Sequence, residues 1–246
     1  MKIHADKVFL KREEANFKAA FCVINEELPE LLKQTSILHP EEKTYYESLK
    51  YDRRRKSYLL GRIAAKQAVF KLLNNEPMDS FSVAFGVFYF PVVKYIQNQN
   101  IQVSITHCNN IGVALAYPEE HPLGIDVEKI DQENTETMKS LIMVKEYNLI
   151  SSCALELSIG STLIWTIKEA LSKVLKTGLT LDFKILEIES IEKVGECYIS
   201  SFMHFSQYKA VSKQIGTHIC TVVLPKNTFC NFNVFWEAFE ASASKK

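Results

Sequence analysis

The sequence predicts an α+β fold built as a pseudo-duplication, in which two lobes each pack an antiparallel sheet against a long helix. Two observations support this fold class. Helical pattern precedes strand pattern in the first half of the chain, and the same order returns in the second half. A proline-containing linker at 118–122 separates the halves, so we expect an N-terminal lobe at 1–122 and a C-terminal lobe at 123–246, with the functional site between them.

The first lobe is predicted to hold a helix followed by strands. Pro40 and two acidic residues after His39 are typical of a first helical turn, and helical pattern continues with interruptions to about Leu73. The segment Phe81–Tyr95 is rich in Phe, Val and Tyr, which predicts one or two strands. The next expected elements are an alternating strand at Ile101–Thr106, a turn at Asn109–Asn110 and a strand at Ile111–Tyr117.

The second lobe begins with a short strand at Leu123–Glu128. A polar helical stretch then precedes a strong helix at Thr162–Lys176, whose apolar residues recur at spacings of three and four. The later segments are predicted to be strands at Cys197–Phe202, His218–Leu224 and Phe229–Phe235, and a frayed tail at Ala241–Lys246.

Composition places the chain among globular proteins and excludes several classes of function. Of its 246 residues, 47% are hydrophobic and 24% are charged. Lys and Arg number 29 and Asp and Glu also 29, which argues against a nucleic-acid partner. No apolar run reaches membrane-spanning length and no secretory signal opens the chain, so no membrane partner is expected. Six scattered cysteines without a C-x-x-C pair argue against structural zinc and favour a cytoplasmic protein.

Two carboxylates lie close together on the strand Gly124-Ile125-Asp126-Val127-Glu128. Residues two apart on a strand share a face, so Asp126 and Glu128 point the same way while Ile125 and Val127 point to the other face. A hard divalent cation such as Mg²⁺ would offset their repulsion. The alternative is a solvated strand face at a sheet edge.

The helix after this strand carries a second set of candidate residues. Trp165, Glu169 and Lys173 follow one another at intervals of four, which places them on one face. An exposed Glu–Lys pair is the simplest interpretation of Glu169 and Lys173. Trp165 favours instead a face that another element covers.

Basic and imidazole side chains form the remaining motifs. Arg55, Arg62 and Lys66 follow one face of the first helix, where they could hold a phosphate group or form a solvated surface. Thr106 and His107 end a strand, where His107 could donate a hydrogen bond to phosphate oxygen or belong to the core.

Taken together, these motifs resemble the 4′-phosphopantetheinyl transferases of the surfactin-synthetase-activating (Sfp) type, which are monomeric pseudo-dimers of about this length. The resemblance spans roughly residues 54 to 183. Its motifs are Gly61-Arg62-x-Ala64-Ala65-Lys66, Ser104-Ile105-Thr106-His107, Gly124-Ile125-Asp126-Val127-Glu128 and Trp165-Thr166-Ile167-Lys168-Glu169-Ala170-x-x-Lys173.

The resemblance implies a holo-[carrier-protein] synthase. Such an enzyme moves the 4′-phosphopantetheine arm of coenzyme A to a serine of an apo acyl or peptidyl carrier protein and releases 3′,5′-ADP, as in fatty-acid, polyketide or nonribosomal-peptide biosynthesis. The implied cofactor is Mg²⁺, with coenzyme A as co-substrate and the carrier protein as partner. The alternative is a non-catalytic module with the same fold that binds coenzyme A or a carrier protein.

The resemblance also implies roles for individual residues. Asp126, Glu128 and Glu169 would hold the metal, and Glu169 would also act as the base toward the carrier serine. Lys173 would neutralise the leaving phosphate. The expected contacts to coenzyme A come from Arg62, Lys66, Thr106, His107 and Lys173, with His107 counted among the catalytic residues.

Overall fold

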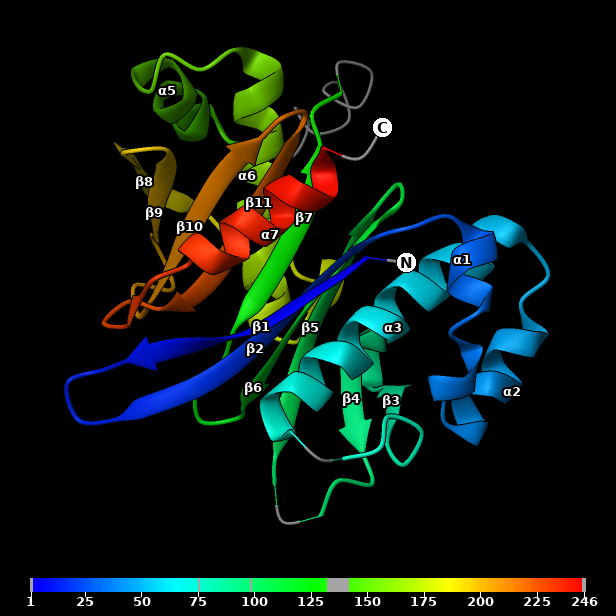
Figure 1. Ribbon diagram of the computed structural model, residues 1–246. Helices are drawn as coiled ribbons and strands as arrows, with labels where there is room; N and C mark the ends of the chain where they lie inside the picture. Colours follow the sequence, from blue (N-terminus) through cyan, green and yellow to red (C-terminus); the bar gives the residue numbers. More distant parts are fainter. Residues whose placement is uncertain (1, 75, 98, 132–141, 245–246) are drawn as a thin grey trace. The chain divides into compact units, whose positions relative to one another are not determined.

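The computed structural model describes residues 2–74, 76–97, 99–131 and 142–244. The chain forms two compact units, the first made of residues 1–122 together with 228–246 and the second of residues 123–227. Each unit contains antiparallel sheet packed against helices, so the predicted α+β class is confirmed (Figure 1).

A five-stranded antiparallel sheet forms the centre of the first unit, in the order β12-β1-β2-β6-β5, and β3 pairs with β4 in a smaller sheet. The strands are β1 (Ile3–Lys11), β2 (Asn16–Asn25), β3 (Ser82–Phe85), β4 (Pro91–Lys94), β5 (Ile101–Cys108), β6 (Ile111–Pro118) and β12 (Phe229–Cys230). The helices are α1 (Leu28–Leu32), α2 (Pro40–Ser48), α3 (Asp52–Leu73) and α7 (Asn233–Ala243), with short 3₁₀ turns η1 (Thr35–Ile37) and η2 (Val87–Tyr89).

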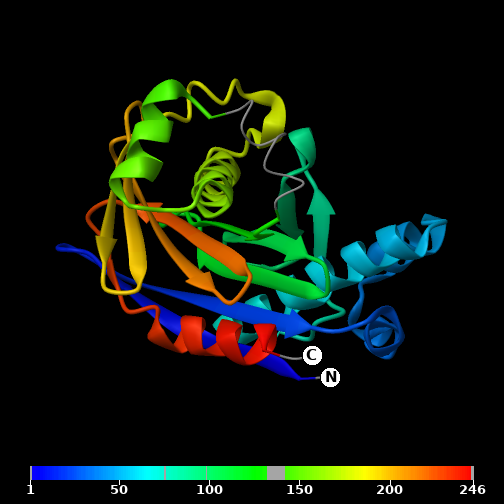
Figure 2. The same ribbon diagram turned by 90° about the horizontal axis from the view of Figure 1, so that it is seen from above.

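Helices cover both faces of this sheet. Consecutive strand residues point to opposite faces, and Cys22 of β2 packs in the core formed with α3 while Phe21 meets Phe235 of α7 edge to face. Small side chains at Ala64 and Ala68 let α3 approach the sheet closely. Figure 2 shows α7, in red, running alongside the first strands, in blue.

The second unit is a five-stranded antiparallel sheet with one long helix on it, in the strand order β7-β11-β10-β9-β8. Its strands are β7 (Gly124–Lys129), β8 (Ile188–Val194), β9 (Cys197–Phe202), β10 (Tyr208–Ile215) and β11 (His218–Pro225). Its helices are α5 (Val144–Ser152), α6 (Leu157–Val174) and the 3₁₀ turn η3 (Gly178–Thr180). Ile164, Ile167 and Leu171 of α6 fill the core against β7 and β11.

The two units repeat one topology. In the first unit, the strands lie in the order β2-β6-β5 and are followed by the β4–β3 pair. In the second unit, the strands lie in the order β7-β11-β10-β9-β8, and each of them corresponds to the strand at the same place in the first unit. Helices α2 and α3 then correspond to α5 and α6. The expected pseudo-duplication is therefore visible in the strand order of the two units.

A buried ion pair marks the same place in each unit. Lys66 of α3 binds Glu42 at 2.8 Å, and Glu42 also accepts a hydrogen bond from the backbone N–H of Val83 at the start of β3. Lys168 of α6 binds Glu146 at 2.8 Å, and Glu146 accepts the backbone N–H of Ile188 at the start of β8 in the same way. Both glutamates also close a capping box at the beginning of their helix.

Several predicted elements differ from the structure. The predicted strand Phe229–Phe235 is wrong beyond Cys230, because α7 begins at Asn233. The supposed tail from Ala241 is helical to Ala243, and its last two residues lie outside the described part of the chain. The helical stretch that ends at Leu73 is two helices, and the sequence analysis did not predict β1, β2, β8 or β10.

The end of the chain packs on the first unit, whereas the sequence analysis gave all of 123–246 to the second lobe. The physical reason is that β12 pairs with β1 and that Phe235 and Phe239 of α7 are buried on the sheet of the first unit. Where the chain leaves and re-enters this unit, buried His121 and Thr228 share a hydrogen bond of 2.8 Å.

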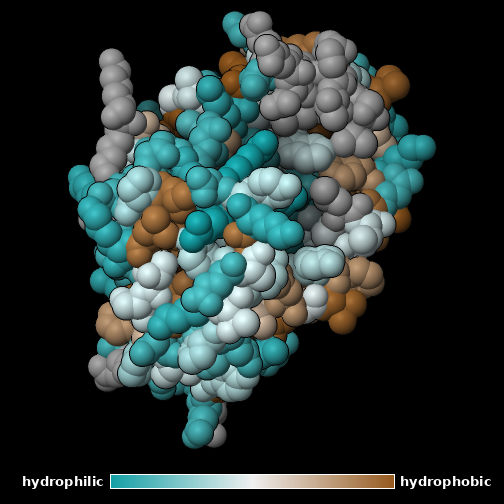
Figure 3. Space-filling view, turned by 90° about the vertical axis from the view of Figure 1, so that its right-hand side faces the viewer, coloured by the Kyte–Doolittle hydropathy of each residue, from teal (hydrophilic) through white to brown (hydrophobic). Residues whose placement is uncertain are grey.

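Among the described residues, no single helix is long and apolar enough to cross a bilayer; α5 and α6 meet that criterion only as a pair, with a bend of 119° between them. On the face drawn in Figure 3, hydrophobic side chains are interspersed with hydrophilic ones.

Candidate functional site

The second unit brings an acidic strand against an acidic helix. Asp126 lies on β7 directly opposite Thr221 of β11, on the part of the sheet that α6 covers. Gly124 makes this close packing possible, because a Cβ atom there would lie 2.0 Å from the backbone oxygen of Ala170. Gly124 of the strand motif therefore packs directly against Ala170 of the helix motif. This contact places Asp126 next to the helical turn from Glu169 to Lys173.

Lys173 bridges helix and strand. Its ammonium donates to Asp126 Oδ1 at 2.7 Å and to the backbone oxygen of Ile125 at 3.0 Å. The Asp126 side chain is almost fully buried, whereas about a quarter of the Lys173 side chain is exposed. The predicted proximity of the strand acid to the helix is thus present, with the lysine in direct contact.

The other two carboxylates lie in partly buried surroundings. Burial, together with the negative charge of Asp126, raises the pKa of Glu128 to about 7. Burial likewise raises the pKa of Glu169 to about 7, opposed by the positive charge of Lys173. Glu169 Oε1 is buried and has no hydrogen-bond partner among the described residues.

These side chains suit a hard divalent cation. Among the residues that the structure describes, three carboxylates interact with the ammonium group of Lys173, so the cluster has unbalanced negative charge when ionised, and one buried oxygen of Glu169 lacks a hydrogen-bond partner. Within the described part of the chain, however, no three or more His, Cys, Asp or Glu residues are arranged in a group that could hold a metal ion. Asp126 instead binds Lys173, which supplies the positive charge at that oxygen.

A buried chain of hydrogen-bonded hydroxyl groups lies next to the acidic strand β7. Thr221 Oγ1 lies 2.8 Å from Ser212 Oγ on the neighbouring strand and 2.8 Å from Thr166 Oγ1 on α6. Thr166 donates in turn to the backbone oxygen of Leu163. These bonds join α6 to β10 and β11 at the strand position opposite Asp126.

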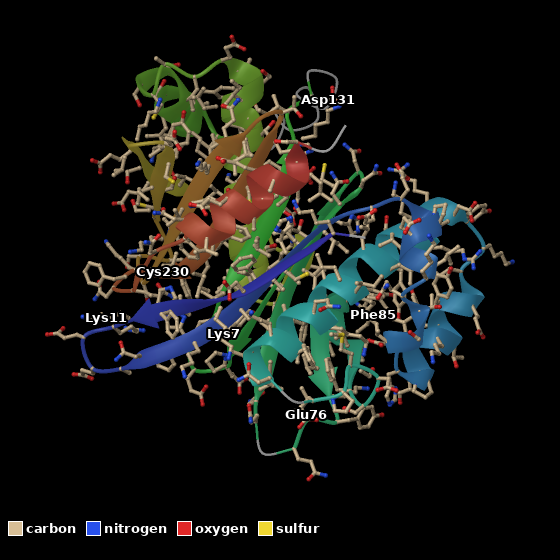
Figure 4. The ribbon with its side chains drawn as sticks, in the orientation of Figure 1. Lys7, Lys11, Glu76, Phe85, Asp131 and Cys230 are labelled. Atoms are coloured by element: carbon tan, nitrogen blue, oxygen red, sulfur yellow. The ribbon has the colours of Figure 1, made fainter. Side chains whose placement is uncertain are left out.

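The first unit contains a separate cavity of about 320 Å³ between α3 and the strands β3, β4 and β5. Its polar lining comes from Arg54, Ser57, Arg62 and His107. Aromatic rings form much of the rest, and they include Phe85, which Figure 4 labels beside α3. Positive charge and flat apolar walls are suited to an anionic ligand that also carries an aromatic ring.

Arg62 is the most distinctive side chain of this cavity. Its guanidinium carbon lies 4.9 Å from the ring centre of Tyr58 and 4.6 Å from that of Phe85, so the two rings hold the charged group. The residue is only 5% exposed. Nε and Nη2 are buried and have no hydrogen-bond partner in the described part of the chain, which leaves two donors for an anion.

The other predicted contacts to coenzyme A divide into two groups. His107 lines the cavity with Arg62, on the same face of β5 as Ile105. Thr106 has the opposite parity on β5 and is buried outside the cavity lining. Lys66 is fully buried, bound to Glu42 and to the backbone oxygens of Met78 and Phe81, so the structure assigns it to the core rather than to a phosphate.

The sequence analysis did not identify the aromatic walls. Tyr45, Tyr58, Phe85 and Tyr89 come from three separate segments, and only the fold brings them together. The turn before β4 has positive φ at Phe88 (58°) and Tyr89 (63°), a conformation that is uncommon for large side chains. Tyr89 is 83% exposed at the rim of the cavity. The one available signal was the density of aromatic residues between Phe81 and Tyr95.

Comparison with known proteins finds a family model that is similar to the acidic segment. Residues 122–223 match the family model ACPS, the 4′-phosphopantetheinyl transferase superfamily. Enterobactin synthase component D from Escherichia coli O157:H7 and that from Shigella flexneri are each 28% identical over 143 residues, which is 54% of this chain and 62% of the relative. The match thus spans 62% of the length of these curated relatives.

Among solved structures, the chain is similar to a holo-(acyl-carrier-protein) synthase from Bacillus anthracis str. Ames, crystallised in complex with CoA (3′,5′-ADP). The TM-score is 0.35 at 21% identity, with 40% of this chain and 93% of that chain covered.

Proposed function

We propose that this chain, whose residues 122–223 match the model of the 4′-phosphopantetheinyl transferase superfamily, transfers the 4′-phosphopantetheine arm of coenzyme A to a serine hydroxyl of an apo carrier protein. The observation that carries the proposal is the cluster of Asp126, Glu128, Glu169 and Lys173, which lies wholly within the matched segment.

The reaction breaks the phosphoanhydride bond of the coenzyme A pyrophosphate and forms a phosphoester bond to the carrier serine. The carrier serine oxygen attacks the phosphorus that bears the pantetheine, and the bridging bond of the pyrophosphate breaks to release 3′,5′-ADP. The serine proton passes to Glu169, directly or through water, because its raised pKa suits a proton acceptor near neutral pH. Charge neutralisation and positioning do most of the remaining work in such transfers.

Asp126, Glu128 and Glu169 would hold Mg²⁺, which supplies Lewis-acid stabilisation of the pyrophosphate oxygens when bound. Lys173 supplies a second positive charge from the same helix as Glu169, one turn further on. Its bond to Asp126 keeps the ammonium at the cluster, where negative charge on the leaving phosphate grows.

The cavity of the first unit would bind the nucleotide end of coenzyme A. Arg62 offers two unpartnered donors to a phosphate group, and His107 adds a further polar contact. Phe85 and Tyr89 present aromatic faces on which a purine base can stack. We extend the proposal to the Sfp type, acting as a monomer, because two units of one topology lie in one chain.

The proposal predicts a covalent product. Incubation of the full chain with an apo carrier protein, coenzyme A and Mg²⁺ is expected to increase the mass of the carrier by one phosphopantetheine group. The gain should disappear when EDTA removes the metal, and a carrier whose acceptor serine is changed to alanine is the control. No mass gain on any of several acyl and peptidyl carriers would overturn the proposed function and favour a module that only binds.

Replacing Arg62 by methionine is expected to raise the KM for coenzyme A by about 10–100-fold, because a charge-assisted contact to phosphate contributes about 1.5–3 kcal/mol. Steady-state transfer to one carrier at varied coenzyme A measures the change. If the contact is to the 3′-phosphate, the variant also loses preference for coenzyme A over dephospho-coenzyme A. Lys66→Met is the comparison for a core role, which should act through stability; an unchanged KM in Arg62→Met would contradict the assignment.

A further inference from the structure

Three residues of α6 share one helical face and meet the sheet of the second unit at three places. Thr166, Ala170 and Lys173 are spaced by four and then three positions, so they follow one another along that face. Ala170 and Lys173 contact β7, through the glycine that opens the strand motif and through Asp126. The third contact is a hydrogen bond of 2.8 Å from Thr166 to Thr221 on the neighbouring strand β11.

The contact at Thr166 belongs to a hydroxyl chain whose direction follows from the number of protons. Thr166 donates its single hydroxyl proton to the backbone oxygen of Leu163, so it accepts in its bond with Thr221. Thr221 therefore donates to Thr166 and accepts from Ser212, whose Oγ lies 2.8 Å away on β10. The chain of donors runs in one direction, from β10 through β11 to α6.

The hydroxyl chain restrains the helix because water does not reach it. Thr166, Ser212 and Thr221 are all fully buried, so breaking a link leaves a hydroxyl proton without an acceptor, which costs more than the bond itself contributes. Apolar contacts in the same interface, such as those of Ile167, have no preferred direction, whereas a hydrogen bond weakens steeply when it is bent. The chain consequently opposes both sliding and rotation of α6 on the sheet.

This restraint acts where the acidic cluster is assembled. Glu169 lies three positions after Thr166 on α6, and Thr221 is the cross-strand partner of Asp126. Because Thr221 gives its proton to Thr166, it has none to offer to Asp126, and the link joins helix and sheet without protonating the carboxylate. A misplacement of about 1 Å between reacting groups can slow a reaction by about 100-fold, so the position of α6 bears directly on the rate.

We propose that Thr166 and Thr221 are positioning residues. Their hydroxyl chain holds α6 at the register and rotation that place Glu169 beside Asp126. The proposal rests on the proposed function, which assigns both carboxylates to the transfer of phosphopantetheine. A hydroxyl pair with a purely structural role would change the stability of the second unit and leave the turnover of the folded protein intact, so the two roles differ in kcat.

Thr221→Val removes the hydroxyl and keeps the shape of the side chain. We expect its kcat for phosphopantetheine transfer to fall by about 10–100-fold with KM for coenzyme A nearly unchanged, because α6 shifts while the cavity of the first unit does not. Thr221→Ser retains the hydroxyl and should restore kcat. All variants are compared at a temperature at which urea unfolding shows them to be folded.

Thr162→Val is the matched control, because it removes a buried hydroxyl from the same helix. That hydroxyl donates within the helix, to the backbone oxygen of Ser158, and the variant should keep the unaltered kcat. Titration with Mn²⁺ followed by electron paramagnetic resonance adds a measurement that does not depend on turnover. Thr221→Val should bind Mn²⁺ about 10-fold more weakly, since the shift of α6 separates two proposed metal ligands.

A double-mutant cycle tests whether the two threonines act through one bond. Thr166→Val and Thr221→Val break the same bond, so the double variant should be no slower than the slower single variant. An unaltered kcat in folded Thr221→Val, a Thr221→Ser variant that is equally slow, or additive losses in the cycle would overturn the positioning role. Absence of transfer by the unaltered chain would instead overturn the proposed function, so the two failures are distinguishable.

Discussion

Lys168→Met is expected to destabilise the second unit by about 3–5 kcal/mol, because it leaves the Glu146 carboxylate buried without its ammonium partner. Lys168 is 1% exposed and Glu146 is fully buried, so water does not replace the lost contact. Urea unfolding in a Trp236→Phe background measures the change, since the fluorescence of Trp165 then reports the second unit. Lys184→Met, an exposed position in the same unit, should change stability by less than about 0.5 kcal/mol.

A second variant separates an unpaired charge from lost packing. Changing both partners, Lys168→Met with Glu146→Leu, removes the charges together and should be more stable than Lys168→Met alone. The Ile188 N–H that Glu146 accepts would still lose its partner, so full recovery is not expected. A double variant that is less stable than Lys168→Met would contradict the charge-based explanation.

The matching pair Lys66–Glu42 is a feature of the repeat that the sequence analysis did not predict. Lys66 and Lys168 belong to charged motifs that were interpreted as functional. The glutamate that binds each lysine lies more than twenty positions earlier, in the first turn of a shorter helix. Helical periodicity places a lysine on one face of the helix, but it does not indicate that the lysine is buried in an ion pair with a carboxylate distant in the sequence. The interpretation of Lys66 as a phosphate ligand failed for that reason.

Sequence patterns predicted those helices and strands whose residues alternate or recur at regular spacings. Strand alternation at Ile101–Thr106 and the apolar stripe of α6 gave β5 and α6 within a few residues. The segment after Phe229 was misassigned because aromatic richness favours strands, although Phe232, Phe235 and Phe239 recur at helical spacings of three and four. Periodicity was the better guide there.

The acidic cluster was more predictable than the cavity for a similar reason. Two motifs at fixed spacing contain all of its members, and Gly124 against Ala170 brings strand and helix together. Tyr58 lies one helical turn before Arg62 on α3, but Tyr45 and Phe85 reach Arg62 only through the packing of α2 and β3 against α3. Spacing along the chain could not predict that set.

Glu169→Gln is expected to lower the transfer rate at saturating coenzyme A by at least about 100-fold. Two contributions act together: general-base catalysis supplies roughly 10²–10⁴-fold, and the same carboxylate is a proposed metal ligand. Glutamine keeps the shape of the side chain but can neither accept the serine proton near neutral pH nor carry the charge. Phosphopantetheine transfer followed by the mass of the carrier protein, at several Mg²⁺ concentrations, measures the loss, and the exposed Glu192→Gln of the same unit is the control.

The dependence on Mg²⁺ separates the two roles of Glu169. If the side chain only bound the metal, a large excess of Mg²⁺ would restore most of the rate in Glu169→Gln. If it also accepts the proton, the rate stays low at every Mg²⁺ concentration, because saturation of the metal site does not supply a base. We expect the second result, because the proposed reaction takes the serine proton to Glu169; in the metal-free chain, burial raises the pKa of this carboxylate to about 7. Transfer at the unaltered rate in this variant would remove Glu169 from both roles and leave Asp126 and Glu128 as the acids of the site.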